Sequence, residues 1–383
     1  MPKPSLLVAM TAFKGSLTNE EACSCVENAA KQLKYKVKSI PIGDGGRGTI
    51  QGVHACFKSE WVTIQATGPM GQPVESKVLC LPNQKAPTTI YIESADTCGH
   101  HLVDPDVREP MRASSYGLGE TINQSIQRWK GSLKKIFIGL GDSAISDMGM
   151  GMLSALGYRF MDAGGKVLWG NAHGLRLTRS IELPDVSDID ITKFTILCDV
   201  LNPLLGPDGS APTFAPQKGA SPTQVSLIEE GMTNINQIIM MMNGRNLADE
   251  PMTGSSGGLA AAFLAFLNAE LVQGSRFFFD WINFSDAIQK ADLIITGEGQ
   301  TDFQTLRGKA PFECLQRVEE AHKKSILISG KLGKGHQPLL KKASLLGCYE
   351  CGREPSPREA LTQKAKELLE DPGLAASVMN HEN

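Results

Sequence analysis

Strand-like and helical segments alternate at both ends of the chain, and this alternation most constrains the fold. Residues 6–10 are a short apolar run, and Thr18 and Glu21 have the spacing of a helix capping box. Apolar residues then recur at helical spacing as far as Leu33, and residues 36–42 alternate like a strand. Near the other end, strands are expected over 291–296, 325–329 and 345–349, and helices over 310–321 and 357–369. Such alternation predicts a mostly parallel sheet with helices on both faces.

The middle of the chain has a different pattern. Short alternating strands are expected between residues 60 and 130, followed by a strand at 135–140, a helix at 147–156 and a strand at 194–200. Residues 257–271 are apolar on nearly all sides, which predicts a buried helix. The fold class is therefore α/β. The pattern predicts a discontinuous first domain, residues 1–60 with 289–383, into which a second α/β domain, residues 61–288, is inserted.

Charge and composition exclude several classes of function. The chain has 38 Lys and Arg against 41 Asp and Glu, which gives a net charge of −3. Such a balance offers no electrostatic footprint for nucleic acid or for an anionic membrane surface. No apolar run approaches the roughly 20 residues of a membrane span, and the first residues do not resemble a signal peptide. We therefore expect neither a nucleic-acid nor a membrane partner, and the odd number of nine cysteines, which argues against a disulfide framework, favours a cytoplasmic protein.

Glycine is enriched, with 39 of 383 residues, and several glycines follow expected strands. Residues 43–48 match the dinucleotide-binding pattern G-x-G-x-x-G, but the next strand does not end in the acidic residue that this fold uses for the ribose. The mismatch disfavours a nicotinamide or flavin site. Two interpretations stay open: a strand-to-helix turn, or a loop whose N–H groups bind a small anion, with Asp44 beside a metal or hydroxyl.

Residues 139–151 form a second glycine-rich passage from a strand into a helix. Gly139, Gly141 and Ser143 lie in it, and the start of the following helix is expected to present unpaired N–H groups to phosphate. The sequence contains no P-loop of the form G-x-x-x-x-G-K-[ST]. A nucleotide would therefore bind without that motif.

Acidic and basic residues follow three further strands. Gly297, Glu298, Gly299 and Asp302 come after the strand expected at 291–296, where two carboxylates suit a magnesium ion or a hydroxyl proton. The alternative is that Glu298 and Asp302 are solvated turn residues. Asp199 ends the strand at 194–200, and Lys14 follows the first strand.

Residues 254–258 satisfy the nucleophile-elbow pattern G-x-S-x-G. A nucleophile elbow requires a preceding strand, and the segment before Gly254 is polar and contains a proline. We therefore do not expect a serine hydrolase.

Several motifs, in order along residues 6–370, resemble the bacterial glycerate kinases of the galactarate and glyoxylate pathway type. The stretches that carry the resemblance are Phe13-Lys-Gly-Ser-Leu17, residues 41–49, residues 67–73, Ala113-Ser-Ser-Tyr-Gly117, the 139–151 loop, residues 198–206, Pro216-Gln-Lys-Gly-Ala220 and residues 296–311. The resemblance implies a flavodoxin-like parallel-sheet domain with a second mixed α/β domain inserted. It also implies an ATP- and Mg²⁺-dependent kinase that phosphorylates D-glycerate, giving 2-phosphoglycerate.

The resemblance also assigns roles to residues. Lys14, Asp44 and Asp199 are the expected catalytic residues, with the choice of base between Asp44 and Asp199 left open. The expected nucleotide-binding residues are Gly139, Gly141, Ser143, Gly297, Glu298 and Gly299, and the expected metal ligands are Asp199 and Asp302. The expected partners are glycerate and ATP, and a homodimer is left open.

Four positions depart from the pattern of these relatives. Thr11 stands where an aspartate is usual, Arg47 where a glutamate is usual and Leu201 where an aspartate is often seen, and Asp142 adds a carboxylate to a proposed anion loop. Arg47 and Asp142 would compensate each other if their loops face. Two hypotheses follow: an active glycerate kinase, or a homologue of little or no activity that keeps the fold as a binding or regulatory protein.

Overall fold

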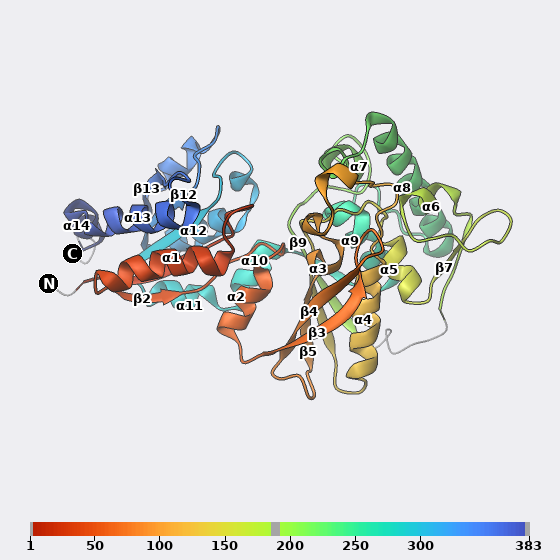
Figure 1. The fold of residues 1–383 in the computed structure, drawn as a ribbon, viewed down its shortest axis with the longest axis horizontal. Helices are drawn as coiled ribbons and strands as arrows, with labels where there is room; N and C mark the ends of the chain where they lie inside the picture. The colour runs from red at the N-terminus through yellow and green to blue at the C-terminus, as the bar shows by residue number, and fades with distance from the viewer. Residues whose placement is uncertain (1–2, 185–191, 380–383) are drawn as a thin grey trace. The chain divides into compact units, whose positions relative to one another are not determined.

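The computed structural model describes residues 3–184 and 192–379. They form two compact units (Figure 1). The first comprises the chain up to Asp44, Gln51–Phe57 and the chain from Ser275 onward, and the second comprises Gly45–Ile50 and Lys58–Gly274. No helix in the described part of the chain is long and apolar enough to cross a membrane.

The first unit is built on a five-stranded parallel sheet of order β13-β12-β11-β1-β2. The strands are β1 (Ser5–Met10), β2 (Lys36–Ser39), β11 (Leu293–Glu298), β12 (Lys324–Ser329) and β13 (Leu345–Glu350). Taken in chain order, this is the flavodoxin-like order 2-1-3-4-5. The order reverses between β1 and β11, so these two strands define the topological switch point. The predicted flavodoxin-like α/β fold is confirmed.

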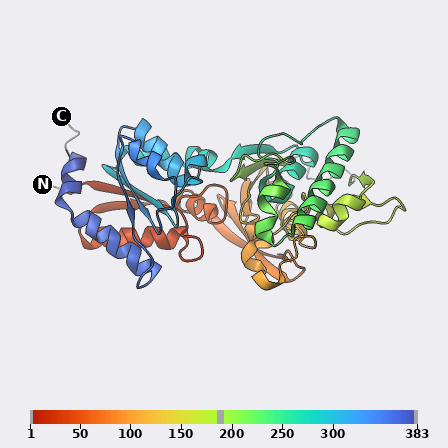
Figure 2. The ribbon, with the colours of Figure 1, turned by 90° about the horizontal axis from the view of Figure 1, so that it is seen from above.

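Helices cover both faces of this sheet (Figure 2). Ile326 and Ile328 share one core with α1 (Asn19–Gln32) and α13 (Pro357–Glu370), whereas Leu327 packs with Leu315 of α12 (Ala310–Glu320). Successive side chains of a strand point to opposite faces, so α12 lies opposite α1 and α13. The remaining helices of the unit are α2 (Thr49–Cys56), α10 (Gly274–Trp281), α11 (Phe284–Gln289) and α14 (Pro372–Met379).

The start of α1 confirms the predicted capping box. The Glu21 backbone N–H donates to Thr18 Oγ1 at 3.1 Å, and the Thr18 N–H donates to Glu21 Oε2 at 2.9 Å. These bonds satisfy backbone donors that have no partner inside a helix. The loop between β1 and α1, which carries Lys14, is thereby held at its helical end.

The second unit contains a six-stranded mixed sheet of order β10-β9-β6-β5-β4-β3. Its strands are β3 (Glu60–Thr67), β4 (Pro73–Leu81), β5 (Thr89–Glu93), β6 (Lys135–Gly139), β9 (Lys193–Cys198) and β10 (Glu270–Gln273). β3, β4 and β5 are antiparallel, and β5, β6, β9 and β10 are parallel. The parallel strands bring the carboxyl ends of β5, β6 and β9 to one edge.

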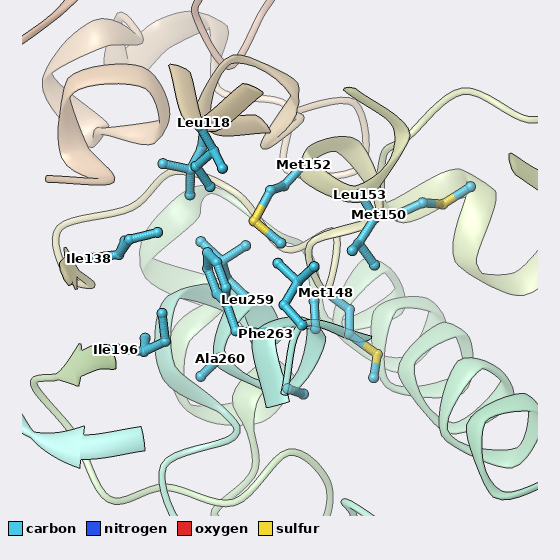
Figure 3. Packing of buried hydrophobic residues seen from close by; sticks show 14 of the residues in the cluster. Leu118, Ile138, Met148, Met150, Met152, Leu153, Ile196, Leu259, Ala260 and Phe263 are labelled. Carbon is cyan, nitrogen blue, oxygen red and sulfur yellow. The ribbon is translucent and has the colours of Figure 1, made fainter. Parts of the chain in front are cut away.

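Helices and a small hairpin complete the second unit. The helices are α3 (Ala95–Cys98), α4 (Tyr116–Arg128), α5 (Met150–Ala155), α6 (Ala172–Leu177), α7 (Ser210–Phe214), α8 (Pro222–Asn243) and α9 (Ser255–Phe266). β7 (Arg159–Met161) and β8 (Ser180–Glu182) form the hairpin. Leu259 and Phe263 of α9 pack among Ile138, Ile196 and Leu118 in the core (Figure 3).

The expected helix over 257–271 is correct in its burial but wrong in its length. α9 ends at Phe266, and Glu270–Gln273 form β10, which pairs in parallel with β9. Asn268 has a φ of +45°, in the left-handed region, so the helix does not continue through it. Likewise, the helix expected over 147–156 begins only at Met150.

The compact units begin and end at other residues than the predicted domains 1–60 with 289–383 and 61–288. Residues 45–50 belong to the second unit, whereas α11 and most of α10 belong to the first. Phe278 of α10 lies against Gly52 of α2, where an added Cβ would be 2.6 Å from its ring. This aromatic contact explains why α10 packs with the first unit.

Candidate active site

The switch point of the first sheet brings together residues from two distant segments. Gly297 of β11 pairs with Met10 of β1, so the loops after both strands begin side by side. A Cβ atom on Gly299 would lie 3.1 Å from the Lys14 backbone nitrogen, so the two loops are in contact. The Lys14 side chain is exposed. Predicted site residues Lys14, Gly297 and Gly299 are thus neighbours at the edge where ligands bind in such sheets.

Glu298 is the buried acid of this edge, with 6% of its surface exposed. Its Oε1 accepts hydrogen bonds from the hydroxyls of Thr305 at 2.7 Å and Thr301 at 3.1 Å. Burial raises the pKa of Glu298 to about 7, although the Thr305 bond and the charge of Lys309 act in the opposite direction. Its carboxyl group therefore changes protonation state near neutral pH, as catalytic acids and bases do.

Asp302 lies four residues further on and is partly buried. Its Oδ1 accepts from the Gln304 N–H and its Oδ2 from the Gln300 side chain, both at 2.8 Å. These bonds shape the turn. The charge of Asp302 also raises the Glu298 pKa, which shows that the two carboxylates interact.

The second sheet has its own cluster of predicted residues at the carboxyl ends of β6 and β9. If Gly139 carried a Cβ atom, that atom would overlap the Gly45 carbonyl oxygen. A Cβ atom on Gly141 would lie 2.9 Å from Gly46 Cα and 3.0 Å from Asp199 Oδ2. The 45–46 segment therefore lies directly against both strand ends. Only glycine permits this approach. The structure brings Gly139, Gly141 and Asp199 together, with Asp199 exposed.

Glu93, at the end of β5, was not singled out by the sequence. It is 4% exposed, and its Oε1 accepts from the N–H groups of Gly48 and Ile50, each at 2.9 Å. The Gly45 N–H donates to Thr49 Oγ1 at 3.0 Å. The interpretation of the 43–48 loop as a cradle of N–H groups for a ligand anion is therefore wrong at Gly45 and Gly48, whose N–H groups are bound within the protein. Burial raises the pKa of Glu93 to about 8.

Asp147, like Glu93, accepts hydrogen bonds from backbone N–H groups at the start of a helix, here α5. This buried carboxylate accepts from the N–H and hydroxyl of Ser115 at 2.7 and 2.8 Å, and from the N–H groups of Gly149 and Gly151 at 3.1 and 3.2 Å. The Met152 N–H donates to the Ser115 hydroxyl. The expectation that this helix start presents unpaired N–H groups to phosphate is wrong, because a carboxylate of the chain already binds them.

Two of the departures from the relatives' pattern share one neighbour. The charges of Arg47 and Asp142 both act on His101: burial and Arg47 lower its pKa, and Asp142 raises it. The gain of a positive charge at position 47 and of a negative charge at position 142 therefore affect the same residue, His101.

The other two departures lie elsewhere. The Thr11 hydroxyl, at the first sheet, donates to the Gly297 carbonyl at 3.1 Å. Leu201, after β9 in the second unit, has 54% of its surface exposed.

Asp44, a predicted catalytic residue, is partly buried and ends the first segment of the first unit.

Ser143, which the sequence analysis placed among the nucleotide ligands, is 5% exposed and lies in the loop before Asp147. Its hydroxyl accepts from the ammonium group of Lys218 at 3.4 Å. Lys218 belongs to a motif that carries the resemblance, but its burial is visible only in the structure.

The carboxylates at the two sheet edges are oxygen donors of the kind that Mg²⁺ prefers. Within residues 3–184 and 192–379, no group of three or more His, Cys, Asp or Glu side chains could hold a metal by itself. Mg²⁺ in kinases is held by one or two carboxylates together with substrate phosphates. The interacting Glu298 and Asp302 supply such oxygen donors in the first unit, and Asp199 supplies one in the second.

The model of the glycerate kinase family matches residues 6–380. The chain belongs to this family. A glycerate kinase from Halalkalibacterium halodurans is 31% identical over 340 residues, 88% of each chain. A glycerate 2-kinase from Escherichia coli K12 is 32% identical over 85% of each chain. A crystal structure of a Salmonella typhimurium LT2 protein designated glycerate kinase 2 superposes with a TM-score of 0.78 at 27% identity, over 99% of this chain and 97% of that one.

Membership of the glycerate kinase family supports a kinase with small-molecule substrates. The match spans both compact units, so the glycine loops and acids of both sheet edges fall inside the family region. The hypothesis of a homologue that only binds or regulates is not favoured by these relatives.

Proposed function

We propose that this protein transfers the γ-phosphoryl group of ATP to a hydroxyl of D-glycerate and that the product is 2-phosphoglycerate. The observation that carries the proposal is the switch point of the first sheet. There, Lys14 stands on a loop in contact with Gly299, next to the buried acid Glu298. A cation, glycine backbone that a ligand can approach closely, and an acid with a pKa of about 7 are groups that suit phosphoryl transfer to a hydroxyl.

Phosphoryl transfer depends mainly on positioning and on neutralising charge. In our proposal, the Lys14 ammonium binds a phosphate or the glycerate carboxylate. The hydroxyl of glycerate loses its proton to a carboxylate, for which Asp44 and Asp199 are the candidates. At the edge of the first sheet, Glu298 is proposed to orient a substrate hydroxyl. Thr301 and Thr305 keep the Glu298 carboxyl group in one orientation through their hydroxyl bonds.

Two loops are candidates for binding the nucleotide phosphates. One contains Gly297 and Gly299 with Glu298, and the other contains Gly139, Gly141 and Ser143. Asp302 and Asp199 are the proposed Mg²⁺ ligands of the respective sheet edges. When bound, Mg²⁺ neutralises charge on the phosphates that the chain alone would have to balance.

A coupled assay with ATP, MgCl₂ and D-glycerate tests the proposal. Enolase added alone converts 2-phosphoglycerate to phosphoenolpyruvate, whereas 3-phosphoglycerate also requires a mutase, so the two coupling schemes identify the product. We expect turnover with enolase alone. Lys14→Ala should lower kcat/KM by about 100-fold, the effect of removing one positioned charge donor. Lys36→Ala, at an exposed lysine of β2, is the control.

Comparison of kcat between Asp44→Asn and Asp199→Asn identifies the general base, because removal of the base should lower kcat by about 10²–10⁴-fold. The absence of turnover with D-glycerate under all conditions would overturn the proposal. A rise in Tm with ATP in the absence of turnover would instead favour the binding-protein hypothesis.

A further inference from the structure

Lys218 is a lysine enclosed in the second unit, with 3% of its surface exposed. It ends a short 3₁₀ turn, Pro216–Lys218, after which Gly219 has a φ of +97°. Gly219 packs on Arg108, whose Nη1 donates to the Gln217 carbonyl at 3.5 Å. Lysine is almost never fully buried unless it is paired, because an ammonium group loses its hydration there. The burial of Lys218 therefore requires an explanation.

The ammonium group of Lys218 holds the loop that follows β6. Its Nζ donates to the Ile145 carbonyl and to the Ser143 hydroxyl. Gly257, with a φ of +68°, is in contact with the same carbonyl, because a Cβ there would overlap it. The Met148 N–H donates to the Gly257 carbonyl at 3.0 Å. The loop is thus held by the Lys218 ammonium group and by Gly257, which belongs to the 254–258 segment with the G-x-S-x-G pattern.

The charge of Lys218 also couples the loop to two carboxylates. Asp147, in the loop before α5, and Asp199, after β9, both raise the pKa of Lys218, as does the weaker influence of Cys98 in α3. Burial is the larger effect and lowers that pKa to about 8. Asp199 is a proposed catalytic residue and Ser143 a proposed nucleotide ligand. One buried cation therefore acts on both groups.

We propose that Lys218 is a positioning residue for phosphoryl transfer, which holds the 143–147 loop in its working arrangement beside Asp199 without touching the substrate. The proposal rests on the proposed function. A purely structural lysine predicts a different outcome, because an apolar side chain of similar length fills the same space without the cost of burying charge. The two roles are separable by comparing stability with activity in a methionine variant.

The experiment compares wild type, Lys218→Met and Lys218→Arg. Lys193→Met is the control, since Lys193 is exposed and lies at the opposite end of β9 from Asp199. We measure Tm, and kcat and KM for ATP and for D-glycerate, between pH 6 and pH 10. Lys218→Met should keep its Tm within a few degrees and lose at least tenfold in kcat. Wild-type kcat should fall above about pH 8, where Lys218 becomes neutral.

Lys218→Arg should recover part of the lost kcat and move the alkaline fall to higher pH, because arginine keeps its charge. A Lys218→Met variant with wild-type kcat and pH profile would overturn the proposal. So would a loss of activity that merely follows a loss of Tm.

Hydrogen exchange separates failure of this inference from failure of the proposed function. Amides of residues 140–148 in wild type should lose protection above about pH 8, after correction for the intrinsic rate, and those of 259–266 in α9 should not. This readout needs neither glycerate nor ATP. Equal protection of residues 140–148 on both sides of pH 8 contradicts the role of Lys218 even if the enzyme phosphorylates glycerate. Absence of turnover contradicts the proposed function whatever the exchange result.

Discussion

Glu93 Oε1 accepts a hydrogen bond of 2.9 Å from the backbone N–H of Gly48, 45 residues earlier in the chain. The carboxylate thereby occupies the start of α2, where a glycine-rich loop of this type would otherwise suit an anion from solution. Asp147 does the same at the start of α5. In two loops that resemble phosphate loops in sequence, some backbone N–H groups are therefore bound by a carboxyl group of the protein itself.

Replacement of the buried Glu93 carboxyl group by an amide, in Glu93→Gln, should reduce the pH dependence of stability. The folded state raises the Glu93 pKa from 4.5 to about 8, so it holds the proton more tightly than the unfolded chain does. The free energy of unfolding of the wild type should therefore fall as pH rises from about 4.5 to about 8. Glutamine keeps one acceptor oxygen and has no charge. We expect the Tm of Glu93→Gln to exceed that of wild type by a margin that grows over this range; parallel Tm curves would contradict the prediction.

Asp147→Asn should destabilise the second unit. The carboxylate accepts four hydrogen bonds, and an amide nitrogen in place of one oxygen would face donors. We expect a loss of about 2–3 kcal/mol in the free energy of unfolding, measured in urea, which is the scale for a buried bond to a charged group. Asp208→Asn, at an exposed aspartate of the same unit, should change it by less than about 0.5 kcal/mol. Equal effects of the two variants would show that Asp147 is not the anchor of this loop.

Gly257→Ala and Gly244→Ala form a matched pair. Both glycines have positive φ, +68° and +76°, so both variants carry the same backbone strain of about 1–2 kcal/mol. A Cβ at Gly244 meets no atom within 4 Å, whereas one at Gly257 overlaps the Ile145 carbonyl. Gly257→Ala should therefore cost at least about 2 kcal/mol more, and it should also lower kcat because it displaces the loop that Lys218 holds. Similar urea midpoints for the pair would argue against this close contact.

Glu298→Gln should remove the rise of kcat with pH near neutrality, which is the acid limb of the kcat–pH profile. With a pKa of about 7, the wild-type carboxyl group loses its proton as pH rises through neutrality, so kcat should rise over the same range if the ionised form orients the hydroxyl. The variant should have kcat at least about tenfold lower and nearly constant with pH. Glu320→Gln, at an exposed glutamate, is the control and should keep the wild-type profile. An unchanged acid limb in Glu298→Gln would assign that limb to another group.

Local features were predictable because their causes lie within a few residues. The capping box of Thr18 and Glu21 joins positions three apart, and the parallel sheet follows from the alternation of strands and helices. The position of Lys14, Glu298 and Asp199 at or just after strand ends was also predictable, since strand ends are visible in the hydrophobic pattern. By contrast, α10 joins the first unit through Phe278, and no local pattern shows which core an aromatic side chain enters.

The sequence by itself determined the α/β class, the family, and the glycines and acids that end the strands, because these depend on hydrophobic period, residue type and motif order. Only the tertiary structure decided which carboxyl groups accept from the N–H groups of the glycine loops and that the Lys218 ammonium group binds the 143–147 loop. Glu93 contacts Gly48, 45 residues away, and Lys218 contacts Ser143, 75 residues away. Every non-proline residue carries the same backbone N–H donor, so whether that donor is left for a ligand depends on the acceptor that folding brings to it.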